Sequence, residues 1–193
     1  MMIESVLQLC TVAMIEVRRD IIPELYQDKI HSMMSNVRFD WHLLSDVTYA
    51  YTSEMRSRYP NAQSTPGFAH MFYDRDNKIE DQYWDFLFPL FLSFVPTPKH
   101  ELLRVKGGLL LPTRIGYNMP HIDAEIPHTT ALYYVNDSDG DTHFFAKNGE
   151  IEQTIKPEKG KLVIFDGLKM HASSCPTLAT NRIVINFNYV CQD

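Results

Sequence analysis

The residues best suited to chemistry in this sequence are His121, Asp123 and His171. In an extended strand, residues i and i+2 project from the same face, so His121 and Asp123 can present an imidazole and a carboxylate to one point. His171 is the best candidate for a third ligand. Two histidines and one carboxylate that leave the opposite positions of a metal open are the donor set typical of non-haem Fe(II) oxygenases. We therefore predict an Fe(II) site formed by these three side chains.

A cationic residue, Arg182, follows this set at the start of the β-branched run Ile183-Val184-Ile185. Its planar guanidinium can hold a carboxylate through two parallel hydrogen bonds. A dicarboxylate such as 2-oxoglutarate needs such a partner at one end when its other end, a 2-oxo acid, chelates the metal. The sequence therefore supplies groups for both ends of such a co-substrate.

The elements that would position these residues are short strands. From His100 onward, β-rich segments alternate with turn residues, a pattern typical of an all-β sandwich or barrel. Seven or eight strands at this spacing fit a jelly roll, with two sheets packed around a mouth. The predicted strands are Leu102 to Leu111, Met119 to Asp123, Thr129 to Val135, Thr142 to Ala146, Ile151 to Ile155, Leu162 to Phe165 and Arg182 to Tyr189.

The first 99 residues have a mixed texture. Apolar periodicity predicts helices from Pro23 to Met34 and from Ile79 to Val95, the second interrupted or kinked near Pro89. Alternating or β-branched residues predict strands, and few aliphatics with two prolines predict a long loop beside the site. The strand predictions are Thr11 to Val17, one or two strands within Phe39 to Tyr51, and Gly67 to Tyr73; the loop prediction is Ser53 to Pro66.

The predicted fold class is therefore mainly β (α+β). We expect a single domain over residues 1–193, in which a mixed α/β N-terminal part (1–99) packs its helices against a double-stranded β-helix (jelly roll) core (100–193). A chain of this length can bury a core without disulfides or a structural metal.

Composition narrows the class of protein. No apolar run approaches the roughly 18–20 residues of a membrane span, so no membrane association is expected. The formal charge of −6 gives no general attraction to polyanions, so no nucleic-acid partner is expected. Cys10, Cys175 and Cys191 show no CxxC or zinc-type spacing, and the start lacks a secretory leader, so we predict a reducing, cytoplasmic location.

A series of motifs in the last ninety residues resembles the 2-oxoglutarate- and Fe(II)-dependent oxygenase family, in its prolyl-4-hydroxylase-like branch. The motifs occur in the family's order and at similar spacings. They are His121-Ile122-Asp123, Ala131-Leu132-Tyr133-Tyr134-Val135-Asn136, Gly140-Asp141-Thr142-His143-Phe144, Pro157 to Phe165, His171-Ala172 and Arg182.

This resemblance implies that His121, Asp123 and His171 bind iron and that Arg182 pairs with the distal carboxylate of 2-oxoglutarate. It also suggests Tyr134 as a phenol donor to that carboxylate. By strand parity Leu132 and Thr130 should face inward with Tyr134, while Tyr133 faces the other way. Tyr117 and Asn118, just before the ligands, are expected to line the mouth of the pocket.

Two departures from the family pattern concern individual residues. Many collagen-type prolyl hydroxylases have lysine at the position of Arg182, and Asp141 stands where the family often carries a second glycine or a glutamate. The resemblance does not reach the first hundred residues, where the determinants of substrate choice can lie hidden.

The expected activity is hydroxylation of a peptidyl proline or a small molecule, with O2 as oxidant and release of succinate and CO2. Two alternatives remain open at this stage. One is a non-catalytic jelly-roll module that binds a metal or a small molecule, and the other is a nucleobase-directed oxygenase, which the acidic charge disfavours. The sequence predicts neither the substrate nor the oligomeric state.

Overall fold

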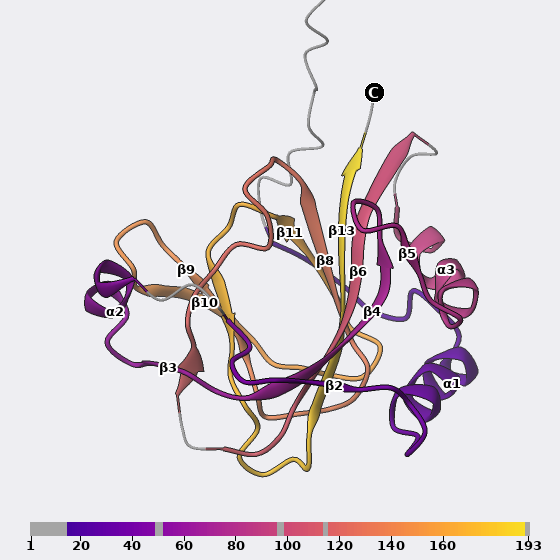
Figure 1. Cartoon of the computed structure of the whole chain (residues 1–193), viewed down its shortest axis with the longest axis horizontal. Coiled ribbons are helices and arrows are strands. Elements are labelled where there is room, and N and C mark those ends of the chain that lie inside the picture. Colours follow the sequence, from indigo (N-terminus) through magenta and orange to yellow (C-terminus); the bar gives the residue numbers. More distant parts are fainter. Residues whose placement is uncertain (1–14, 49–51, 96–98, 114–115, 192–193) are drawn as a thin grey trace, which may run out of the picture.

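The structure, a computed structural model, describes residues 15–48, 52–95, 99–113 and 116–191. Its largest element is an eight-stranded sheet in the order β1-β11-β8-β13-β6-β4-β2, with β5 paired to β4 (Figure 1). These strands are β1 (Glu16–Arg18), β2 (His42–Leu44), β4 (Gly67–Asp74), β5 (Ile79–Glu80), β6 (His100–Leu110), β8 (Thr129–Tyr134), β11 (Leu162–Asp166) and β13 (Arg182–Cys191).

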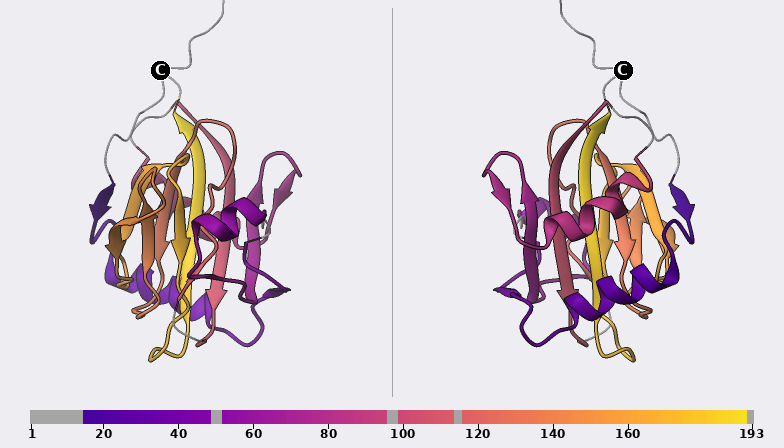
Figure 2. Two further views of the ribbon diagram at one scale, coloured as in Figure 1. Left: turned by 90° about the vertical axis from the view of Figure 1, so that its left-hand side faces the viewer. Right: turned by 90° about the vertical axis from the view of Figure 1, so that its right-hand side faces the viewer.

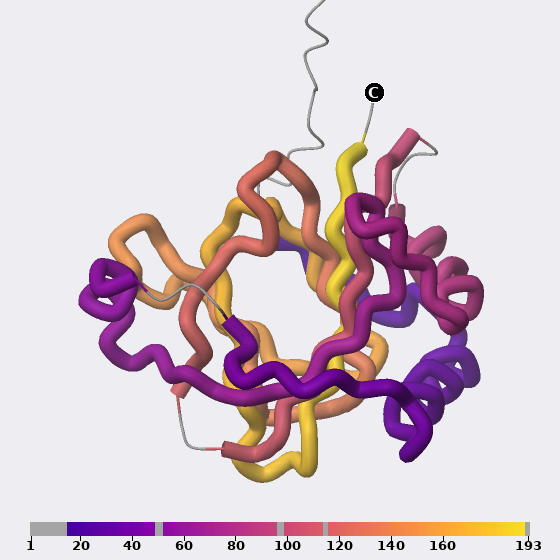
Figure 3. The backbone as a smooth tube through the Cα atoms, in the orientation of Figure 1, coloured from indigo at the N-terminus to yellow at the C-terminus, as the bar shows by residue number. Residues whose placement is uncertain are grey.

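A smaller sheet faces the large one across the interior (Figure 3). It has the order β10-β9-β12, from Ile151–Ile155, Thr142–Phe145 and His171–Ser173. A short parallel pair, β3 (Ala62–Gln63) and β7 (Tyr117–Asn118), lies beside it. Strands β9 and β12 therefore oppose β8, β13 and β6.

Two of the three helices in the described residues cover the outer face of the large sheet (Figure 2). They are α1 (Glu24–Met34) and α3 (Trp84–Leu92), while α2 (Ser53–Arg58) lies beside the small sheet (Figure 1). Ile30, Met34 and Phe91 are fully buried in the cluster between these helices and the sheet. None of the helices in the described ranges is long and apolar enough to cross a membrane.

The side chains of β8 alternate between the two faces of the large sheet, as the sequence predicts. Tyr133 and Ala131 pack in the outer cluster beneath the helices, whereas Leu132 and Tyr134 pack in a second cluster between the sheets. Successive side chains of a strand point to opposite faces, so this alternation fixes which residues of β8 reach the interior.

Some of the predicted elements differ in the structure. The Ser53 to Pro66 loop prediction is wrong, because the segment contains α2 and β3. The hydroxyl of Thr52 caps α2 by accepting a hydrogen bond from the Met55 amide at 3.1 Å. The helix predicted from Ile79 begins only at Trp84, since Ile79 and Glu80 pair with β4, and Pro89 lies inside it.

Other N-terminal predictions are met in part. The strand predicted over Thr11 to Val17 lies largely outside the described residues, and β1 begins at Glu16. The strand predicted within Phe39 to Tyr51 is the three-residue β2, with residues 49–51 outside the description. The N-terminal strands belong to the large sheet: β4 pairs with β6, and β1 pairs with β11.

Candidate metal centre

His121 and His171 are brought together by a single antiparallel β-bridge. The His121 amide donates to the His171 carbonyl at 2.9 Å, and the His171 amide donates to the His121 carbonyl at 3.1 Å. The two rings lie with their centroids 4.7 Å apart. The strand predicted over Met119 to Asp123 is wrong, because β7 ends at Asn118 and Pro120 has no amide hydrogen to continue a ladder.

Both imidazoles are oriented by backbone carbonyls. His121 Nδ1 donates to the Met119 carbonyl at 3.2 Å, and His171 Nδ1 donates to the Lys169 carbonyl at 2.9 Å. A carbonyl only accepts hydrogen bonds, so these contacts place the ring proton on Nδ1 and leave the lone pair on Nε2. In its neutral form, each histidine therefore presents the lone pair of Nε2, the form that binds a metal.

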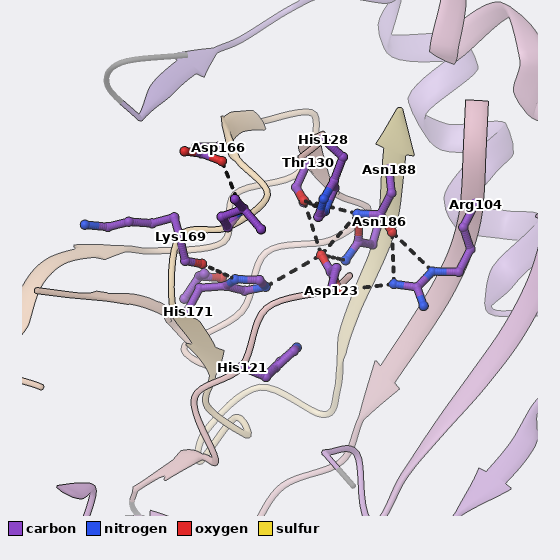
Figure 4. Close-up of polar contacts among 12 residues, drawn as sticks. Arg104, His121, Asp123, His128, Thr130, Asp166, Lys169, His171, Asn186 and Asn188 are labelled. Carbon is purple, nitrogen blue, oxygen red and sulfur yellow. Dashed lines mark hydrogen bonds and ion pairs between the residues drawn. The ribbon is translucent and has the colours of Figure 1, made fainter. Parts of the chain in front are cut away.

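Asp123 completes the cluster and is the most heavily hydrogen-bonded of the three (Figure 4). One ligand atom from each of His121, Asp123 and His171 lies within 4.8 Å of the others, and His171 Nε2 is 3.8 Å from Asp123 Oδ2. The carboxylate accepts four side-chain hydrogen bonds, from Arg104 at 3.2 Å to Oδ1, and from Asn186 at 3.0 Å, Asn188 at 3.1 Å and Thr130 at 3.3 Å to Oδ2.

The donors to Asp123 come from three adjacent strands of the large sheet. Asn188 on β13 is paired with Arg104 on β6 and with Thr130 on β8, so the three side chains form one row across the sheet. The row fixes a carboxylate that lies on an irregular loop. Sequence reasoning missed these residues, although polar side chains alternating with apolar ones at Asn186 and Asn188, in register with Arg182, were an available signal.

Electrostatics favours the metal-binding protonation state. Burial and the nearby His171 lower the pKa of His121 to about 4, although Asp123 pulls in the opposite direction. Burial alone would raise the pKa of Asp123, but His171, His121 and Arg104 together hold it well below its usual range. At neutral pH the site therefore offers a neutral His121 and an ionised Asp123, which suit a divalent cation.

Arg182 lies at the inner end of the same cavity, 3% exposed. One of its terminal nitrogens donates to Thr142 Oγ1 at 2.9 Å, and its Nε is a buried donor with no hydrogen-bond partner among the described residues. Tyr134 also donates to Thr142 Oγ1, at 2.7 Å, and its ring centroid is 5.6 Å from the Arg182 guanidinium carbon. The hydroxyl of Tyr134 thus points towards Thr142 and Arg182, and Tyr134 is not among the residues that line the cavity.

The cavity itself runs from Arg182 to the three candidate ligands. Alternate residues of β13 and β6 line it, as the strand period of two requires, and Leu132, Thr142 and His171 contribute from other strands. A second cavity, on the side of α2, also reaches His121 and Asp123 and is lined by Met55, Tyr59 and Glu125 among others. His121 and Asp123 therefore lie where an inner cavity and an outer one meet, and His171 lines the inner one.

Tyr117 and Asn118 line neither of these two cavities. Asn118 is buried and donates to the hydroxyl of Ser173 at 3.0 Å. Tyr117 packs its ring edge-to-face against Phe145, with centroids 5.2 Å apart. These side chains support the small sheet behind the cavity, because β7 runs beside β12 rather than across the opening.

Residues 113–190 match the family model of the 2OG-Fe(II) oxygenase superfamily. No sequence among the curated proteins matches this chain. The fold is similar to solved structures at low sequence identity, so these similarities concern the fold.

An oxidoreductase of the 2OG-Fe(II) oxygenase family from Burkholderia pseudomallei is 11% identical, with a TM-score of 0.66 over 91% of this chain and 85% of the other. A viral collagen prolyl hydroxylase from Paramecium Bursaria Chlorella virus-1 is 14% identical, with a TM-score of 0.56 over 92% of this chain and 96% of the other. A prolyl hydroxylase from Trichoplax adhaerens, in complex with a hypoxia inducible factor peptide fragment, is 12% identical, with a TM-score of 0.60 over 92% and 83%.

Proposed function

Because residues 113–190 belong to the 2OG-Fe(II) oxygenase superfamily, we propose that His121, Asp123 and His171 bind Fe(II) in this chain and that Arg182 binds the distal carboxylate of 2-oxoglutarate. The predicted family resemblance and the predicted jelly-roll fold are confirmed. The chain is thus an oxygenase of a family that uses Fe(II) and 2-oxoglutarate, and its substrate is unidentified.

One observation carries the assignment of the ligands. Three side chains from two separate segments present ligand atoms within 4.8 Å of one another, and both imidazoles keep Nε2 available because Nδ1 is bound to a carbonyl. Two imidazoles and one carboxylate leave the remaining positions of an octahedral ion open. The residues present therefore fit Fe(II) and a chelating co-substrate.

When bound, the Fe(II) centre supplies the oxidising chemistry that converts 2-oxoglutarate and O2 to succinate and CO2 and hydroxylates the substrate. The residues of the protein position the metal and the co-substrate and balance their charges. Asp123 offers a negative charge that is held in place by four side-chain hydrogen bonds. Arg182 offers a buried positive charge at the inner end. The two sheets exclude water around both, which strengthens each of these interactions.

Tyr134 has a supporting place in this proposal. Its hydroxyl and an Arg182 nitrogen meet on Thr142 Oγ1, so the phenol fixes the position of the guanidinium through Thr142. Direct donation to the co-substrate would require the Tyr134 hydroxyl to leave Thr142. Asn118 would act by holding Ser173, which lines the cavity, whereas Tyr117 packs behind the cavity.

We propose that the partners are O2 and a small-molecule or peptide substrate, that residues 1–193 form one oxygenase domain, and that the protein is cytoplasmic. Pairing of the N-terminal strands onto the large sheet supports the single domain. Burial of Cys175 and Cys191, in a chain whose cysteines show no paired spacing, supports a reducing compartment. The Trichoplax structure contains a peptide, which supports testing peptides alongside metabolites.

The test is release of succinate from 2-oxoglutarate in the presence of Fe(II) and O2, measured for the native protein and for His171→Ala. We expect the native protein to release succinate with or without an added substrate. His171→Ala should abolish this release, whereas His42→Gln, a control at an exposed position, should retain it. Equal succinate release by His171→Ala would refute the ligand assignment. Metal binding without any succinate release would instead identify a non-catalytic binding module.

A further inference from the structure

A lysine that no motif singles out lines the metal cavity. Lys106 lies on β6, two residues from Gly108 along the same wall, and is paired with Asn186 of β13. Its ammonium group makes no hydrogen bond or ion pair with the residues the structure describes. It lies two residues from Arg104 on the same face of β6 and lines the same cavity as Asp123. Lys106 is only partly exposed, so water stabilises its charge less than at the surface, and a ligand of opposite charge would stabilise it further.

The charge on Lys106 is not needed for the cofactors of the proposed site. The charges of Fe(II) and Arg182 are balanced by Asp123 and the two carboxylates of 2-oxoglutarate, with both histidines neutral. Arg104 forms an ion pair with Asp123, and its side chain is 29% exposed, so water also stabilises its charge. Among the described residues that line the cavity, Lys106 is therefore the one cationic side chain that has no anionic partner in the protein or in the proposed cofactors.

The walls around Lys106 are largely apolar. Leu44, Val47, Phe68, Leu132 and Val184 line the same cavity. Apolar walls with one placed charge are typical of a site for a small ligand with an apolar body and one group of opposite charge. Since the wall lies between the two sheets, it favours a small molecule over an internal segment of a peptide.

We propose that Lys106 binds a carboxylate of the substrate, so that the substrate is a small organic acid with an apolar body. This inference rests on the proposed function, because it assigns Lys106 to the substrate after Fe(II) and 2-oxoglutarate have taken the other charged groups. Lys106 is then a specificity-determining residue of the metal site.

The experiment uses the full chain loaded with Mn(II) and 2-oxoglutarate, and matched acid and amide probes. The probes are 3-phenylpropanoate against 3-phenylpropanamide, N-acetyl-L-proline against N-acetyl-L-prolinamide, and hexanoate against hexanamide, together with a proline peptide blocked at both ends. Thermal stabilisation and calorimetry measure binding. We expect at least one acid to bind about tenfold or more tightly than its amide, because charge-assisted contacts are the stronger ones.

Four proteins are compared. Lys106→Met should remove the preference for the acid, Lys106→Arg should retain it, and Lys29→Met, which removes an exposed lysine on α1, should match the native protein. The affinity for 2-oxoglutarate should change less than about threefold in Lys106→Met, because the co-substrate is held by the metal and Arg182.

Several results would overturn the assignment. These are amides binding as well as acids to the native protein, the blocked peptide binding better than every acid, or an unchanged acid preference in Lys106→Met. A large loss of 2-oxoglutarate affinity in Lys106→Met would assign the lysine to the co-substrate instead. Failure of the native protein to bind Mn(II) or 2-oxoglutarate would refute the proposed function itself, a result separable from the others.

Discussion

The two ends of the inner cavity differ in how completely the protein satisfies their polar groups. At the metal end, Asp123 accepts four side-chain hydrogen bonds, and each histidine has its Nδ1 bound to a carbonyl. At the inner end, Arg182 Nε is buried without a hydrogen-bond partner among the described residues, and so is the hydroxyl of Thr48, which lines the same cavity.

A buried polar group without a partner costs about 1–3 kcal/mol, so such groups are rare unless a ligand pairs with them. The three proposed metal ligands are therefore preorganised by the protein, whereas Arg182 at the inner end is left for a ligand to pair with. The contrast predicts that a metal binds to the protein alone, and that a dicarboxylate gains affinity by pairing with groups that have no other partner.

The strongest test of the preorganised end is Asp123→Ala. The change removes a ligand and leaves the charge of Arg104 without its partner, so we expect Mn(II) affinity to fall by roughly a thousandfold and stability by about 3 kcal/mol. Calorimetric titration with Mn(II) and chemical denaturation measure the two effects. Asp76→Ala, at a carboxylate 77% exposed, is the control, and equal losses in both variants would contradict the assignment.

Arg182→Met tests the end that a ligand completes. Loss of a buried, charge-assisted pair should weaken 2-oxoglutarate binding to the Mn(II)-loaded protein by about a hundredfold, while Mn(II) affinity stays within about twofold. Calorimetry measures both constants. Retained 2-oxoglutarate affinity would mean that the distal carboxylate pairs elsewhere.

The sequence predicts which chemical groups lie at the two ends of the cavity, but not how they are arranged in space. The types and order of His121, Asp123, His171 and Arg182 indicate a metal and a carboxylate, because few chemistries use that set. Strand parity correctly assigned Tyr133 and Tyr134 to opposite faces, since a period of two needs only local sequence.

Most of what the sequence did not predict depends on contacts between distant segments. His121 meets His171 through one β-bridge rather than along a predicted strand, and no local pattern encodes that pairing. The row of Arg104, Thr130 and Asn188 exists only because β6, β13 and β8 are neighbours. The capped helix α2 was hidden because six residues form too short a window for apolar periodicity.

The stability of the metal-free protein should depend on pH because of His121. His121 has a pKa of about 4 in the folded state against 6.5 for an ordinary histidine, so the unfolded state binds the proton more tightly. Stability is therefore lost as the pH falls from about 6.5 towards 4. We expect a loss of about 2 kcal/mol between pH 7 and pH 5, measured by denaturation.

His121→Gln provides the comparison for this measurement, because it cannot titrate in that range. Its stability should depend less steeply on pH than that of the native protein over the same interval. Equal pH dependence in the two proteins would show that His121 is not the group responsible.

Arg104→Met is the counterpart of Arg182→Met at the metal end. Side chains that orient a metal ligand typically contribute ten- to hundredfold to metal affinity, and Asn186 and Asn188 remain on Asp123, so we expect a loss of about tenfold. The affinity of the Mn(II)-loaded protein for 2-oxoglutarate should be unchanged. If either arginine variant altered both affinities equally, the two ends would not be independent.

The smallest expected effect belongs to Tyr134→Phe. The change removes the hydroxyl that donates to Thr142 and keeps the ring beside Arg182, so the guanidinium loses one indirect constraint and no charge. A neutral hydrogen bond contributes about 1 kcal/mol, so 2-oxoglutarate affinity should fall by about fivefold and Mn(II) affinity should not change. Thr142→Val removes the shared acceptor and should produce a loss at least as large. If Tyr134→Phe alone approached the loss seen in Arg182→Met, the phenol would contact the dicarboxylate directly instead of acting through Thr142.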